Sequence, residues 1–327
     1  MEDQDGAELC FPQLLNASCR KPKLQRTDAV LMYLLFFICV LTVCLNLLVI
    51  ISVSHFKQLH TPTNLLLLSL AVSDFLFGLD STLEAHRQTA CWFLGDIICC
   101  LHGYVSSIAL SASIGEMVLI SVDRYVAICD PLHYPTRVTA TRVKMCVCMC
   151  WFCSIIYNGV YFRLILTQPG RFNSCYGQCV IATSYTDGYV DFVISFIAPI
   201  TVIIILYMKV FVTAVSQARA MRSHVAAVTL QHSGTVMTKK SELKAARTLG
   251  VVVVVFLMCY SPSYCFYLLE VTTDATLPAA SGVFLLDINP CLNPVIYALF
   301  YPWFRKAIRL IFSLQILQPG SRETNIL

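Results

Sequence analysis

Residues 29–54 read AVLMYLLFFICVLTVCLNLLVIISVS, a run with no charged side chain and a single amide, Asn46. A helix needs roughly 20 predominantly apolar residues to cross the hydrocarbon core of a bilayer. The run therefore predicts a membrane-spanning helix. Polar groups inside a bilayer are expensive and mark functional positions, so Asn46 already stands out.

Six further apolar runs follow, and together the seven predict an all-α membrane protein, a bundle of seven transmembrane helices. The second run and the last are the weakest by hydropathy, because carboxylates interrupt the second and amides and prolines the last. The six runs cover residues 63–83, 97–120, 143–162, 190–214, 249–269 and 277–300.

The bulk composition favours the same setting. The chain is 57% hydrophobic and 13% charged, whereas a soluble domain averages roughly 45–50% apolar and about 25% charged residues. So little charge would not cover a soluble surface of this size, but lipid-facing helices need no polar coat. The net charge of +4 gives no reason to expect a nucleic-acid partner.

The positions of Lys and Arg predict the orientation. They gather after the first, third, fifth and seventh runs, which the positive-inside rule makes the cytoplasmic side. Residues 1–28 then form an extracellular tail of a multi-pass plasma-membrane protein, and Asn16 in this tail fits the N-glycosylation sequon. Residues 29–301 form the seven-helix domain, and residues 302–327 an amphipathic helix on the inner leaflet and a cytoplasmic tail.

Polar, aromatic and proline residues recur on successive runs, and their order is more specific than any one of them. They are Asn46, Asp74, Asp123-Arg124-Tyr125, Trp151, Pro199, Tyr207, Phe256, Pro262 and Asn293-Pro294-Val295-Ile296-Tyr297. This pattern resembles the rhodopsin-like G-protein-coupled receptors over nearly the whole chain.

Two stretches narrow the resemblance. Residues 55–64 (HFKQLHTPTN) and residues 289–304 (NPCLNPVIYALFYPWF) are similar to the trace amine-associated receptors, although Pro290 stands where that family has Ser. The resemblance implies a receptor, not an enzyme, that detects small amines, with olfaction as the expected role. It further implies a rise in cAMP through a stimulatory or olfactory heterotrimeric G protein.

The family also implies a switch at the cytoplasmic end. Arg124 would pair with Glu242 at the inner end of the sixth run, and breaking the pair would open a cleft for the G protein. A solvated interfacial Arg124 is the alternative. The residues of this switch are Asp123, Arg124, Tyr125, Tyr207, Glu242, Asn293, Pro294 and Tyr297.

Three more features follow from the resemblance. Asp74, Ser113 and Asn293 would line a hydrated pocket that can take a sodium ion, and no other cofactor or metal is expected. A disulfide would join Cys99 to Cys179. Cys175 would pair with the N-terminal tail through Cys19, with Cys10 as the alternative, in keeping with an oxidising exterior.

The expected ligand anchor is Asp191. Aminergic relatives carry an Asp on the third span where this chain has Ser106, whereas Asp191 lies about two helical turns, roughly 12 Å, outward of Pro199. A branch of the family that is abundant in teleost fish shows the same exchange of positions. A carboxylate in a low-dielectric pocket attracts an ammonium strongly. The alternative is that Asp191 only caps the helix at the water boundary.

Aromatic walls would add cation–π contacts to the ammonium. The candidates are Tyr104, Tyr264 and Tyr267, and Tyr260 replaces the Trp that relatives carry on the sixth span. Asp287, Asp80 and Glu84 are further carboxylates in the outer half of the bundle, and a second acid would suit a diamine or polyamine. Asp287 could equally be protonated or hydrogen-bonded to a neighbour.

Three rival functions remain. A multi-span transporter or channel usually shows internal repeats, and we see none. An opsin needs a Lys on the last span for its Schiff base, where this chain has Asp287. A receptor of the same fold with a non-amine ligand is the third.

Overall fold

The computed structural model describes residues 8–14, 16–21, 26–171, 173–181, 185–227, 248–265 and 279–326. Within them, six helices are long and apolar enough to cross a membrane, and α10 passes the same test when joined to α11. The spanning elements are α1 (Arg26–His55), α2 (Pro62–Thr89), α3 (Gly95–Cys129), α5 (Ala140–Tyr161), the continuous stretch of α7 (Tyr185–Asp191), the π-helical turn Phe192–Ile197 and α8 (Ala198–Ala227), the helix Thr248–Cys265, and α10 (Ala279–Phe300).

Local chemistry sets the helix boundaries. Thr61 accepts a hydrogen bond from the Asn64 amide (3.3 Å) and Pro62 occupies the first turn of α2. Thr139 caps α5 in the same way through the Arg142 amide. A hydroxyl cap satisfies one of the free N–H groups of a first turn, and proline fits there because it has no N–H to lose.

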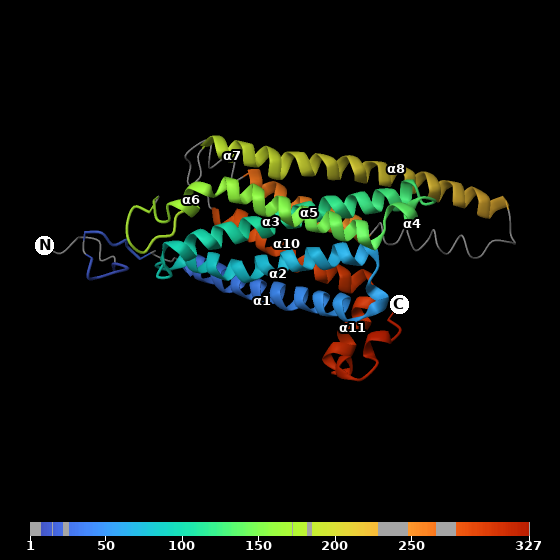
Figure 1. The fold of residues 1–327 in the computed structure, drawn as a ribbon, viewed down its shortest axis with the longest axis horizontal. Helices are drawn as coiled ribbons and strands as arrows, with labels where there is room; N and C mark the ends of the chain where they lie inside the picture. The colour runs from blue at the N-terminus through green and yellow to red at the C-terminus, as the bar shows by residue number, and fades with distance from the viewer. Residues whose placement is uncertain are drawn as a thin grey trace.

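The helices pack lengthwise around one core. Figure 1 shows α1, α2, α3 and α5 as neighbours, with α8 along one side, and these helices contact one another in the order α1–α2–α3, with α3 also touching α5 and α8. Large apolar side chains cover the outer faces: Phe36, Phe152 and Phe211 are 56%, 65% and 65% exposed. Such surfaces suit a lipid environment rather than water.

The two ends of the bundle differ. The N-terminal tail lies at one end, near α6 (Arg163–Thr167). Two disulfides attach the tail there and a third lies at the same end, so we name it the disulfide end. At the other end, the α11 end, α4 (Tyr134–Arg137) follows α3 and α11 (Pro302–Phe312) turns by 102° from the last span.

The C-terminal segment folds back at the α11 end. Lys57 forms an ion pair with Glu323 (3.0 Å), Gln58 accepts from the Ile326 amide (3.0 Å), and the Ile326 side chain is 2% exposed. Residues 302–312 form the expected amphipathic helix. The residues after it, up to 326, return to the connection between α1 and α2.

Candidate functional site

Asp191 lies where α7 meets the π-helical turn. The hydroxyls of Tyr157 (2.9 Å) and Ser195 (2.7 Å) both donate to its Oδ1, and the residue is half-buried. Asp191 forms no ion pair with the described residues. A carboxylate held by two neutral hydroxyls keeps its negative charge available to a cation.

Aromatic side chains lie on the same segment and on neighbouring helices. Tyr157 stacks on Tyr161 (6.3 Å between centroids), and Phe196 stacks on Tyr264 (4.5 Å) from the helix Thr248–Cys265. Tyr157 and Phe196 were not expected from sequence. The sequence did contain a hint of both: Phe196 lies on the same apolar segment as Asp191, and Tyr157 lies on the span before it.

The other expected ligand residues occupy different places. Tyr260 is 1% exposed and packs on Phe256 with 4.3 Å between ring centroids, so it belongs to the buried core. Ser106 is half-buried on α3. The Tyr104 hydroxyl donates to the Ile155 carbonyl of α5 (3.1 Å), so this hydroxyl is turned toward α5. Tyr267 lies outside the described residues.

A second group of carboxylates lies between α2, α3 and α10. His102 on α3 contacts Asp80 through Nδ1 (2.8 Å) and Glu84 through Nε2 (3.0 Å). Arg87 donates two hydrogen bonds to Glu84 (2.6 and 2.8 Å). Ser81 lies 2.6 Å from Asp287 on α10. Sequence analysis named these acids as candidates but did not name His102 or Arg87, whose side chains pair with the carboxylates of Asp80 and Glu84.

The disulfides at this end form a single covalent ring. The bonds Cys10–Cys91, Cys19–Cys175 and Cys99–Cys179 join the ends of the segments 10–19, 91–99 and 175–179, so the three segments close on one another. Two of these bonds are the pairs that the family resemblance implied. Cys10 is not the partner of Cys175: it lies against Gly177 and bonds Cys91, just past the end of α2.

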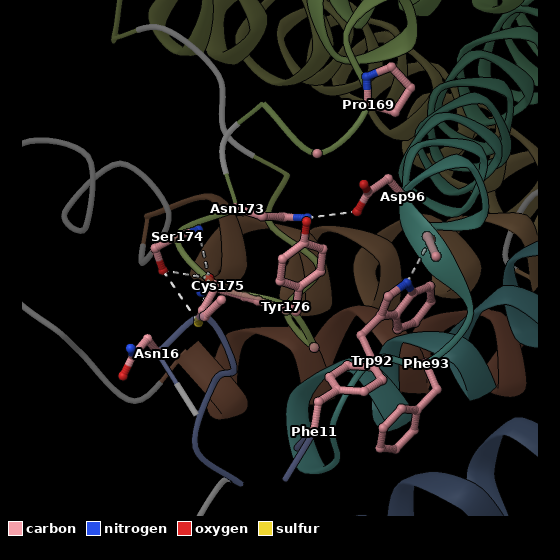
Figure 2. Close-up of a pocket in the computed structure, with 15 residues that line it drawn as sticks. Phe11, Asn16, Trp92, Phe93, Asp96, Pro169, Asn173, Ser174, Cys175 and Tyr176 are labelled. Carbon is pink, nitrogen blue, oxygen red and sulfur yellow. Dashed lines mark hydrogen bonds between the residues drawn. The ribbon is translucent and has the colours of Figure 1, made fainter. Parts of the chain in front are cut away.

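A cavity of about 610 Å³ lies within and beside this ring. Figure 2 shows the rings of Phe11, Trp92 and Phe93 gathered on one side of it and Asp96 hydrogen-bonded to Asn173 (2.8 Å) on another. Asn16 of the sequon lines the cavity and is exposed. The ring therefore shapes a vestibule at the disulfide end.

At the α11 end, a buried polar network surrounds Arg124. Its guanidinium pairs with Asp123 and donates to the Thr63 hydroxyl (2.7 Å), while Tyr134 donates to Asp123 (2.9 Å). Burial, reinforced by the nearby carboxylate of Asp123, raises the pKa of Tyr134 on α4 to about 12, so this hydroxyl stays protonated at neutral pH. Glu242, the expected partner of Arg124, lies outside the described residues.

The remaining residues of the expected switch lie on α3, α8 and α10. Tyr297 is 1% exposed, and the buried hydroxyls of Tyr207 and Tyr297 find no hydrogen-bond partner in the part of the chain that the structure describes. Tyr125 is half-buried on α3, with the Lys209 Nζ 5.8 Å from its ring centroid. Pro294 lies within α10.

The expected ion pocket is brought together. Asp74 accepts from Asn293 (2.8 Å) and Ser113 (3.3 Å). The Asn293 Oδ1 is buried without a hydrogen-bond partner among the described residues. An orphaned buried oxygen beside a carboxylate and a hydroxyl is the donor set that a hard cation or a water molecule satisfies.

Comparison with known proteins completes the description of the site. A model of the seven-transmembrane receptors of the rhodopsin family matches residues 45–297. Trace amine-associated receptor 8a of Rattus norvegicus is 37% identical across 99% of this chain and 97% of its own length. Trace amine-associated receptor 7e of Mus musculus is 38% identical across 98% of this chain and 92% of its own length.

Proposed function

The chain belongs to the trace amine-associated receptors of the rhodopsin family, and from this membership we propose that it is an amine receptor whose anchor is Asp191. The family consists of G-protein-coupled receptors rather than enzymes. The proposed readout is a rise in cAMP through a stimulatory or olfactory G protein. The proposed location is the plasma membrane, with the disulfide end outside the cell.

The environment of Asp191 carries this proposal. Both neighbouring hydroxyls donate to Oδ1, and Oδ2 accepts no hydrogen bond from the described residues, so a ligand ammonium can approach that oxygen. Tyr264 and Phe196 offer ring faces to an alkyl or aromatic amine. Ser106 cannot replace the anchor, because a hydroxyl carries no charge.

Three subsidiary proposals complete the receptor. The ring of disulfides supports an oxidising exterior for the disulfide end, and a glycan on Asn16 would then stand beside the vestibule. A sodium ion between Asp74, Ser113 and Asn293 would satisfy the Asn293 Oδ1, which lacks a hydrogen-bond partner within the described ranges.

The test is Asp191→Asn, which keeps the shape of the side chain and removes its charge. Losing one partner of a buried, hydrogen-bonded charge pair costs about 2–5 kcal/mol, or roughly 30-fold to several thousand-fold in affinity. We expect EC50 values for amines in a cAMP reporter assay to rise by that factor, and Asp191→Glu to retain part of the response.

Asp187→Asn is the matched control. It makes the same chemical change one helical turn earlier on α7, at a residue that is also half-buried, and we expect little change in EC50. A wild-type response in surface-expressed Asp191→Asn would place the anchor elsewhere.

A further inference from the structure

Among the described ionisable side chains between α2, α3 and α10, the carboxylates outnumber the cations. Asp80 and Asp287 are each 6% exposed, and Glu84 is within electrostatic range of Asp287. Against these three acids stand Arg87 and His102. His102 contacts a carboxylate through each ring nitrogen, and it can donate to both only as the imidazolium. Even then, one negative charge is left over among these five described side chains.

The pairing shows where the excess charge lies. Arg87 forks onto Glu84, and His102 bridges Glu84 and Asp80. Among the residues that the structure describes, Asp287 accepts a hydrogen bond from the Ser81 hydroxyl alone. The Ser81 oxygen also lies 2.9 Å from the Phe77 carbonyl, so one proton serves two acceptors. Among the described residues, no cation forms an ion pair with Asp287.

A second atom nearby is also unsatisfied. The Asp80 Oδ2 is buried and has no hydrogen-bond partner in the described part of the chain. Asp80 precedes Ser81 on α2, so it flanks the contact with Asp287. An unpaired buried carboxylate oxygen is costly in a membrane span, and it is satisfied either by a proton or by a cation that enters with a ligand.

The position of this group determines which ligand could reach it. Asp287 belongs to α10, which packs on α1 and α2, whereas Asp191 belongs to α7 and faces α5. The helix α3 contacts both α2 and α8, so it connects the two groups of elements. A ligand that pairs with both carboxylates must therefore carry two ammonium groups joined by a chain.

We propose that Asp287, flanked by Ser81 and Asp80, is a second cation subsite that binds the distal ammonium of a polyamine whose first ammonium is held by Asp191. This inference rests on the proposed function. A monoamine would occupy the Asp191 site alone, so the second subsite distinguishes polyamines from monoamines.

The experiment measures ligand-induced thermal stabilisation of purified full-length receptor in lipid nanodiscs, which does not depend on G-protein coupling. The probes are phenylethylamine, cadaverine and spermine. Asp287→Asn keeps the side-chain shape, and it should weaken spermine roughly 30-fold while leaving phenylethylamine unchanged. Asp287→Glu keeps the charge and should retain most of the spermine affinity.

Asp130→Asn, the same change at the α11 end, is the matched control and should shift none of the probes. Two outcomes would overturn the subsite. If Asp287→Asn weakens the binding of all three amines equally, Asp287 is a structural residue. If it leaves spermine binding unchanged, a proton alone satisfies Asp287. Wild-type receptor that binds no amine contradicts the proposed function itself. Asp191→Asn distinguishes the Asp191 anchor from the Asp287 subsite, because it should weaken the binding of phenylethylamine in addition to that of spermine.

Discussion

The two ends of the bundle are held by different chemistry. At the disulfide end, three covalent bonds close a ring through the N-terminal tail, the end of α2 and the loop before α7. At the α11 end, the contacts are hydrogen bonds and ion pairs, from the Arg124–Asp123 pair to the ion pair of Lys57 with Glu323.

The difference matches what each end is proposed to do. A ligand vestibule gains from walls that hold one shape, because a rigid site loses little entropy on binding. A switch needs two arrangements of similar free energy, and non-covalent contacts can be exchanged without breaking the chain. The hydroxyls of Tyr207 and Tyr297, which have no hydrogen-bond partner among the described residues, are groups that a second arrangement could satisfy.

Breaking the ring should have the largest effect. The three bonds span 80, 81 and 156 residues of sequence, so a chain-entropy argument applied to each bond alone predicts the largest loss for Cys19–Cys175. In a closed ring, however, the other two bonds keep the cysteines close, and any one removal reopens the same short loop. We expect each paired Cys→Ser variant to lose roughly 3 kcal/mol and to show a similar fall in Tm.

Thermal unfolding of purified receptor tests this equality, and surface expression measured on an epitope tag is the companion readout. As a control, Cys146→Ser removes a free, exposed cysteine of α5 and should leave Tm unchanged. A loss that instead grows with sequence separation would show that the three bonds act independently.

Arg124→Ala sharpens the comparison at the other end. The guanidinium holds Asp123 and Thr63 and is the proposed contact for the G protein. We expect the cAMP response to disappear while amine-induced thermal stabilisation of the receptor persists, because the disulfide end is untouched. Asp130→Asn, at an acid outside this network, is the control. A preserved cAMP response in Arg124→Ala would contradict the proposed switch.

Sequence reasoning was strongest where one residue type dictates its surroundings. Apolar runs specify spans because a bilayer leaves a backbone few alternatives, and Asp74, Ser113 and Asn293 met as the resemblance implied. It was weakest where partners come from distant elements. No local sequence pattern predicts these contacts, since each depends on how neighbouring helices and loops are placed. Examples are the pairs His102–Asp80, Tyr157–Asp191 and Cys10–Cys91.

The C-terminal segment gives the smallest expected effect. The side chains of Lys57 and Glu323 are 62% and 74% exposed, and exposed ion pairs contribute about 0–1 kcal/mol, so Lys57→Ala should barely change Tm. Ile326 is 2% exposed and belongs to the same buried cluster as Phe56 and Leu59, so Ile326→Asp should release residues 321–326. Hydrogen exchange of those amides reports the release. If these amides are equally protected from exchange in both variants, backbone contacts alone hold the segment. If they exchange fast in Lys57→Ala, the ion pair, not the buried Ile326, holds the segment in place.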